Sequence, residues 1–96
     1  MSNALPAALK EESFRFSPLK CHEVGITLQA AKFLRWLYIE SSRTNAQIIA
    51  TFGMGLAWTM LDAGYVTNLL GKVDSSDTNF WSLTGEGIEI LRKLVS

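Results

Sequence analysis

Cys21 and His22 are the residues of this sequence whose types could do covalent chemistry, as a nucleophile and its base. Neighbouring residues rarely face each other, and the chain holds one cysteine and one histidine in all. A zinc site needs at least three protein ligands at suitable spacing, and the sequence offers no such set. We therefore expect a buried thiol beside a surface imidazole, with no catalytic residue, no metal ligand and no cofactor.

Positive charges that could contact phosphate are few and scattered. The candidates in the body of the chain are Lys32, Arg35, Arg43 and Lys72, and the N-terminal part adds Lys10, Arg15 and Lys20. Nine basic and nine acidic residues give a formal net charge of zero. Because a nucleic-acid-binding surface is usually basic, this balance weakens the case for a nucleic-acid binder without excluding a local patch.

Length and composition indicate one small domain. The chain has 96 residues, of which 48% are hydrophobic, and this share is sufficient for a core. One cysteine permits no internal disulfide, which fits a reducing compartment. The N-terminus lacks the pattern of a signal peptide, and no run approaches the ~18 apolar residues of a membrane span. These features predict a cytoplasmic protein that does not bind membranes.

The first 18 residues leave three interpretations open. Residues 5–12 could form a short helix with Pro6 in its first turn. Phe14 and Phe16 could instead pack on the body as part of an extended arm. The segment could also be a frayed terminus. We accordingly divide the chain into residues 1–20, an arm or short helix, and residues 21–96, the main domain.

A helix is expected from about residue 28 to residue 40, with Thr27 as its cap. Its apolar residues are too many for one stripe, and the set formed by Phe33, Leu34 and Leu37 can face the core. Trp36 and Ile39 then lie elsewhere. They are covered either by the N-terminal arm or by a second copy of the chain, and the second alternative predicts a homodimer.

Residues 44–63 predict a helix-turn-helix. Thr44 and Gln47 have the form of a capping box that opens the first helix. Gly53 and Gly55 interrupt the apolar spacing, which suggests a turn between two short helices, the second from Gly55 to Ala63. The alternative is one long helix whose glycines permit close packing. The second helix would expose Trp58 and Thr59.

The rest of the chain predicts a hairpin and a last helix. Gly64 is placed to end the preceding helix in the left-handed conformation. Residues 65–73 and 80–83 have strand-type side chains, and residues 74–79 form a polar turn. Thr84 is placed to cap a helix whose apolar stripe consists of Ile88, Leu91, Leu94 and Val95.

This last segment resembles the winged-helix family. The resemblance rests on Ala63-Gly64-Tyr65-Val66 before the hairpin and on Leu83-Thr84-Gly85-Glu86-Gly87 after it, and it covers roughly the last two thirds of the chain. It implies an α+β fold of three or four helices with a β-hairpin "wing" on the C-terminal side. It also implies that the helix from Gly55 to Ala63 is the recognition helix, which in DNA-binding members enters the major groove.

Two functions follow, and an enzyme is not expected. The resemblance favours a transcriptional regulator that binds double-stranded DNA through Arg43, Lys72, Lys32, Arg35 and Thr59. The charge distribution favours a winged-helix module that binds a protein instead, because residues 47–71 contain no Lys or Arg. The candidate protein-interface residues are Trp36, Ile39 and Trp58, since exposed tryptophans often anchor interfaces.

Overall fold

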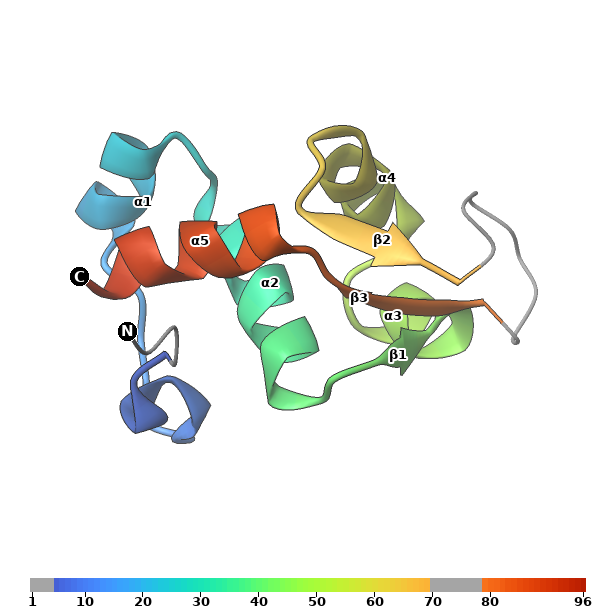
Figure 1. The fold of residues 1–96 in the computed structure, drawn as a ribbon, viewed down its shortest axis with the longest axis horizontal. Coiled ribbons are helices and arrows are strands. Elements are labelled where there is room, and N and C mark those ends of the chain that lie inside the picture. Colours follow the sequence, from blue (N-terminus) through green and yellow to red (C-terminus); the bar gives the residue numbers. More distant parts are fainter. Residues whose placement is uncertain (1–4, 70–78) are drawn as a thin grey trace.

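The structure, a computed structural model, describes residues 5–69 and 79–96. Within these residues the fold is α+β, as expected, but it has five α-helices where three or four were expected. The helices are η1 (Ala7–Lys10, a 3-10 turn), α1 (Pro18–Val24), α2 (Leu28–Ile39), α3 (Asn45–Thr51), α4 (Met54–Asp62) and α5 (Gly85–Val95). The strands are β1 (Arg43–Thr44), β2 (Val66–Asn68) and β3 (Phe80–Leu83). Figure 1 shows α1 and the end of α5 at one end of the molecule, opposite the described ends of β2 and β3.

The strands form one antiparallel sheet in the order β1-β3-β2. Val66 pairs with Leu83 and Asn68 pairs with Trp81, so the expected hairpin is confirmed where it is described. The part of its first strand expected at residues 70–73 lies outside the described residues. Strand β1 was not expected from the sequence. It pairs Arg43 with Trp81 and makes β3 the central strand.

Helix α5 begins where the sequence predicts. The Thr84 hydroxyl accepts a hydrogen bond from the Gly87 amide at 3.1 Å and so satisfies one free N–H of the first turn. The predicted stripe needs one correction, because Ile90 is buried whereas Ile88 is only partly buried. The buried side of the helix is rotated toward Gly87, Ile90, Leu91 and Leu94, and this rotation follows from the close approach of Gly87 to the main chain at Tyr65.

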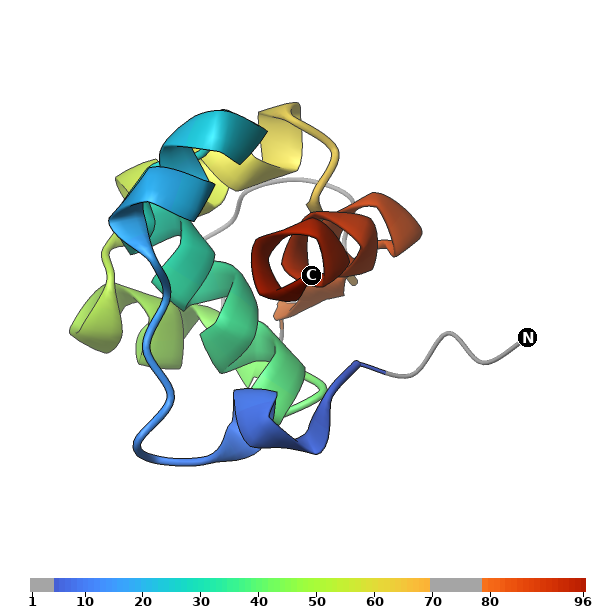
Figure 2. The ribbon, with the colours of Figure 1, turned by 90° about the vertical axis from the view of Figure 1, so that its left-hand side faces the viewer.

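The N-terminal segment packs on the body, so the frayed-terminus interpretation is wrong for residues 5–18. Leu9 in η1 is fully buried, and the Phe16 side chain is buried in the same core. Figure 2 shows this segment passing beside α2 between η1 and α1. Helix α1 is capped by Ser17 and ends at Gly25, whose φ of +88° is left-handed. The expected boundary at residue 20 falls inside α1.

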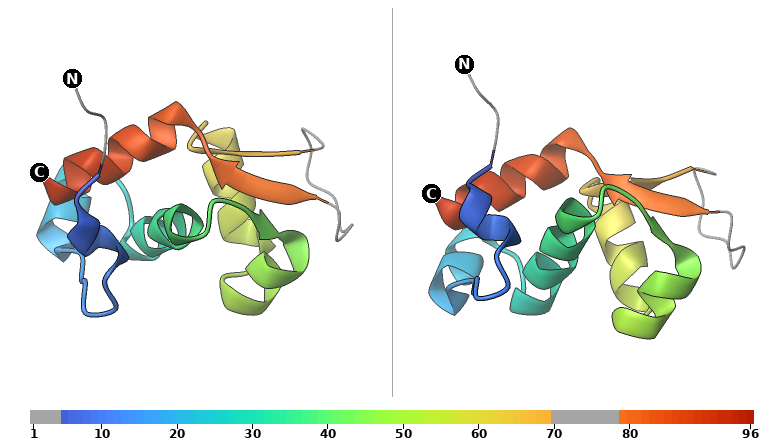
Figure 3. Two further views of the ribbon diagram at one scale, coloured as in Figure 1. Left: turned by 60° about the horizontal axis from the view of Figure 1, so that its bottom comes forward. Right: turned by 90° about the horizontal axis from the view of Figure 1, so that it is seen from below.

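Helix α2 runs through the centre of the core. The Thr27 hydroxyl caps it as expected, accepting from the Ala30 amide at 3.0 Å. Phe33, Leu34 and Leu37 are buried, as the sequence predicts. In both views of Figure 3, α5, β2 and β3 lie above α2 and α3. Trp81 of the central strand, whose side chain is 0% exposed, fills the space between these layers.

Candidate nucleic-acid interface

Helices α3 and α4 form the helix-turn-helix that the sequence predicts. Thr44 and Gln47 make the full capping box: the Gln47 amide donates to the Thr44 hydroxyl, and the Thr44 amide donates to Gln47 Oε1. The turn between the helices is at Gly53, whose φ of +89° is a conformation that other residues rarely adopt. Gly55 has open space where a Cβ would stand, so close packing does not require a glycine there. The alternative of one long helix is wrong.

The turn is fixed to α2 by aromatic side chains. Phe52, the last residue before Gly53, makes an edge contact with Phe33 at 5.3 Å between ring centroids and another with Trp36 at 5.2 Å. Such contacts contribute about 0.5–1.5 kcal/mol each beyond the buried area. The position of α4 relative to the core is therefore set at its N-terminal end by this cluster of rings.

The exposed surface of α4 carries no positive charge. Ala57 and Met60 face the core, while Trp58 is 51% exposed and Thr59 is also exposed. The Thr59 hydroxyl donates to the Gly55 carbonyl within the helix at 3.0 Å, which leaves its oxygen lone pairs open to a donor. On α3, Ile49 is 54% exposed. This surface can make apolar contacts and a few neutral hydrogen bonds, and ionic contacts must come from elsewhere.

Arg43 is held against Trp36. Its guanidinium carbon lies 4.1 Å from the centroid of the indole ring, and its Nη2 donates to the Trp36 carbonyl at 3.1 Å. Burial lowers the pKa of the guanidinium and the nearby Glu40 carboxylate opposes this effect; an arginine remains charged in either case. Arg43 thus brings a fixed, half-buried positive charge to the edge of the sheet.

Lys32 and Arg35 face the N-terminal segment rather than α4. Lys32 is exposed, whereas Arg35 is half-buried. Arg35 donates from Nε to the Leu9 carbonyl at 2.6 Å and from Nη2 to the Glu11 carbonyl at 2.5 Å. Its first structural role is therefore to hold η1 on α2. Lys32 and Arg35 line a hollow beside the N-terminal segment, and Thr59 is not among the residues that line it.

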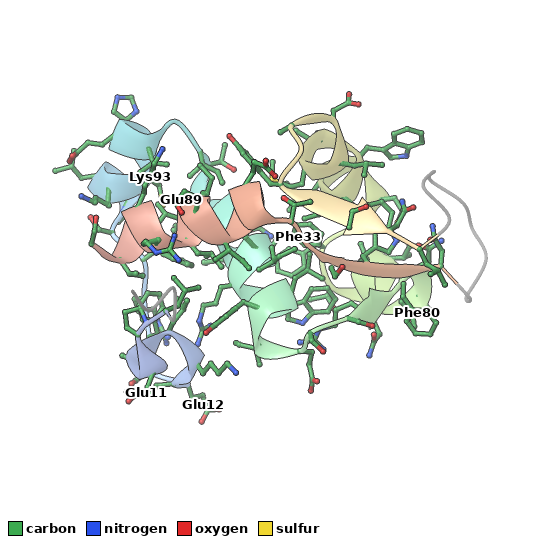
Figure 4. The ribbon with its side chains drawn as sticks, in the orientation of Figure 1. Glu11, Glu12, Phe33, Phe80, Glu89 and Lys93 are labelled. Carbon is green, nitrogen blue, oxygen red and sulfur yellow. The ribbon has the colours of Figure 1, made fainter. Side chains whose placement is uncertain are left out.

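The last predicted phosphate contact, Lys72, lies outside the described residues. The described ends of the hairpin expose Leu69 and Phe80. Figure 4 shows Phe80 at this end of the molecule, far from Glu11 and Glu12 beside η1. Several positive residues were assigned to a nucleic-acid surface. Of those that the structure describes, Arg43 is the one that belongs to the same sheet as the hairpin.

The two residues with covalent chemistry do not form a site. Cys21 is buried, and burial raises the pKa of its thiol. His22 is exposed on the surface of α1. No group of three potential metal ligands occurs among residues 5–69 and 79–96. In the same part of the chain, no helix has both the length and the apolar character needed to cross a membrane.

Comparisons with known proteins identify the fold. The sequence matches neither a protein-family model nor a curated protein. Among solved structures, the fold is similar to that of a mutant of S. aureus MepR bound to an oligodeoxyribonucleotide, with a TM-score of 0.65 and 19% sequence identity. The fold is the winged helix. The similarity covers 81% of this chain and 62% of the MepR chain, so the protein spans less than two thirds of that chain.

Two features that hold this winged helix together were missed in the sequence. Trp81 Nε1 donates a hydrogen bond to Asn45 Oδ1 at 2.5 Å, and both residues are fully buried. This bond ties the first residue of α3 to the central strand. The second feature joins the segments before and after the hairpin on which the family resemblance rests. The Thr84 hydroxyl donates a hydrogen bond to the Gly64 carbonyl at 2.6 Å. No signal in one sequence pairs residues so far apart.

Proposed function

We propose that this protein is a DNA-binding transcriptional regulator that acts in the cytoplasm. The observation that carries the proposal is the helix-turn-helix followed by a hairpin in a winged-helix arrangement, similar to a protein whose structure was determined with an oligodeoxyribonucleotide. In this proposal α4 enters the major groove of duplex DNA, where side chains meet base edges.

The composition of α4 limits the contacts that it can make in a groove. Thr59 can accept a hydrogen bond from an exocyclic amine, and Trp58 can contact a thymine methyl group. Neither provides the bidentate contact of an arginine with guanine, so we expect weak discrimination between sequences. Phosphate contacts are assigned to Arg43 and Lys72. Lys32 and Arg35 lie beside the N-terminal segment, and we assign them a smaller share of the phosphate contacts.

The salt dependence of binding to duplex DNA tests this proposal. With two or three phosphate contacts per subunit, the slope of log affinity against log salt should be about −2 to −3, since each contact contributes ~0.9. Replacing Arg43 and Lys72 together by Ala should lower the affinity and reduce the slope by about 2. Lys93→Ala is the matched control, because Lys93 is exposed on α5 at the far end of the molecule from Phe80 (Figure 4). Absence of binding even at low salt would refute the regulator proposal.

A protein-binding module on the winged-helix scaffold is the second candidate. It is supported by the half-exposed Trp58 on a helix that carries no Lys or Arg. If duplex DNA does not bind, capture of a specific protein should depend on Trp58. Trp58→Ala should then abolish capture while the helical circular-dichroism signal stays unchanged, because the ring is not part of the buried core.

A homodimer through Trp36 and Ile39 is also part of the proposal. Its support is the surplus of apolar residues on α2, of which these two are only partly buried within one chain. Ile39→Gln should shift the sedimenting mass from dimer to monomer. Trp36 is a poorer choice for this test, because its ring also packs on Phe33 and Phe52. Sedimentation of the unchanged chain as a monomer at high micromolar concentration would exclude the dimer.

A further inference from the structure

A cavity of about 450 Å³ opens between the N-terminal segment and α2. Its size is that of a small-molecule site, since such sites usually measure about 300–1,000 Å³. Its apolar walls are Phe14 and Phe16 on one side and Leu28, Trp36, Ile39 and Phe52 on the other. Four of these six residues are aromatic, so a flat apolar group has rings to pack against on both sides.

Among the described residues, those that line the cavity and carry a charge are all positive. They are Arg15, Lys32 and Arg35, and no acidic residue of the described ranges lines the cavity with them. Arg15 donates to the carbonyls of Glu12 and Phe14, and Arg35 donates to those of Leu9 and Glu11. Lys32 makes no hydrogen bond or ion pair with another described residue. The cavity thus combines an aromatic interior with a positive charge that is left unpaired in the described part of the chain.

We propose that this cavity binds a small organic anion with a flat apolar body. The body would lie among the aromatic rings, and the acidic group would face the Lys32 ammonium. An organic cation is disfavoured by the three like charges, and a neutral apolar molecule would leave the Lys32 charge without a partner. This site shares Lys32 and Arg35 with the proposed phosphate contacts, and Trp36 and Ile39 with the proposed dimer surface. It requires neither DNA nor a second copy of the chain.

The N-terminal segment forms one wall of the cavity, so a bound molecule should change how readily this segment moves away from α2. Arg35 reaches from α2 to two carbonyls of the segment, and its guanidinium carbon lies 5.3 Å from the centroid of Phe14. A bound molecule would add contacts that span the same gap. Binding should therefore slow the opening of residues 14–16 away from α2.

The probe for this site is 2-naphthoate, with the neutral 2-naphthamide as its partner of the same shape. A ligand of about 13 non-hydrogen atoms should bind with a Kd on the order of 0.1–1 mM. Titrations followed by ¹H–¹⁵N NMR should shift the Trp36 indole and the amides of residues 14–16. Hydrogen exchange at these amides should slow on binding. Lys32→Gln should weaken binding of 2-naphthoate about three- to fivefold, the range expected for an exposed charge pair. Lys93→Gln, on α5, is the matched control.

Each outcome of this experiment either supports the proposed site or overturns it. Preference for 2-naphthoate over 2-naphthamide that is lost in Lys32→Gln and kept in Lys93→Gln supports the site. Equal binding of the two probes, or an equal effect of the two variants, overturns it. Shifts confined to the surroundings of Trp58, or no binding at 5 mM probe, also overturn it. Binding that weakens as the protein concentration rises would show instead that a second copy of the chain covers this cavity.

Discussion

The main-chain carbonyl of Tyr65 occupies the space that a side chain on residue 87 would need. A Cβ built on Gly87 overlaps the Tyr65 oxygen, so glycine is the residue that fits here. The same oxygen accepts a hydrogen bond from the Thr84 amide at 3.1 Å. The turn after α4 and the first turn of α5 are therefore in direct main-chain contact. This contact fixes the end of α4 to α5, the helix that follows the hairpin.

Gly87→Ala should destabilise the fold by about 2–4 kcal/mol, because the backbone of Tyr65 must move away and lose its bond to Thr84. The measurement is the free energy of unfolding from urea denaturation. Gly85→Ala is the matched control two residues earlier in the same helix, where a Cβ meets nothing within 4 Å. It should be neutral or stabilise by up to about 1 kcal/mol, since alanine favours a helix more than glycine does. Equal effects of the two changes would show that the close approach at residue 87 is not rigid.

The buried hydrogen bond between Asn45 and Trp81 should contribute to the stability of the fold. Asn45→Ala leaves the buried indole N–H without an acceptor and should cost about 1–3 kcal/mol. Trp81→Phe leaves the Asn45 oxygen without its donor and also creates a cavity, so it should cost more. The double variant should be less destabilised than the sum of the two single changes, because the second change removes a partner that is already lost.

Phe80→Leu serves as the control for this pair. Phe80 is the neighbour of Trp81 on β3, but its side chain faces the opposite side of the sheet and is 44% exposed. Its replacement should change the free energy of unfolding by less than about 1 kcal/mol. Additive effects of the Asn45 and Trp81 changes would contradict the importance of the hydrogen bond.

Arg35→Gln should release the N-terminal segment from α2. The shorter amide cannot reach the carbonyls of both Leu9 and Glu11, and the packing of the guanidinium on Phe14 is also lost. Hydrogen exchange at Leu9 should become faster while exchange within β3 stays slow, because the segment opens without global unfolding. Lys32→Gln, one turn earlier on the same helix, should leave both rates unchanged. Equal acceleration of hydrogen exchange at Leu9 and within β3 would indicate global destabilisation instead.

The buried Cys21 thiol should make the stability of the fold depend on pH. Its pKa is raised by burial in the folded chain, so unfolding makes the thiol easier to ionise. The contribution of this group to stability is complete below the unfolded pKa of about 8.5 and is lost as the pH rises through the folded pKa. We expect unfolding free energies of the original chain and of Cys21→Ala to lie closer together at pH 9.5 than at pH 7. A gap that is constant between these pH values would contradict the shift.

The thiol should also react slowly with an aromatic disulfide reagent in the folded protein. Reaction requires exposure of the buried sulfur, so labelling should be at least about 100-fold slower than in urea. Fast labelling of the folded chain would show that α1 opens readily.

Local signals in the sequence were sufficient to predict most helix ends. Thr27, Thr44 and Thr84 cap helices through contacts with residues three positions later, and Gly53 and Gly64 take the positive φ that their positions suggest. These interactions lie within one turn of the chain. The sequence of those few residues therefore contains both partners.

Features that depend on distant partners could not be predicted. Strand β1 has two residues, which pair with Trp81 and Phe80. Threonine is common in strands, but two residues are too few to show the alternation that predicts one. For the candidate DNA surface the sequence correctly expected an exposed Trp58 on a helix without Lys or Arg. It could not show that Arg35 is engaged by η1, because the two carbonyl acceptors belong to the main chain and have no sequence signature.

The order of the strands in the sheet has a consequence for how the chain acquires its structure. The central strand, β3, is the last of the three in the sequence, and both outer strands pair only with it. While the chain is being synthesised, β1 and β2 therefore have no partner until Phe80–Leu83 have emerged from the ribosome. The helices can form early from local contacts, but the orientation of α3 and α4 is completed only when this late segment arrives, since contacts between distant residues close slowly. Synthesis arrested before Phe80 would leave α4 on a chain without a sheet.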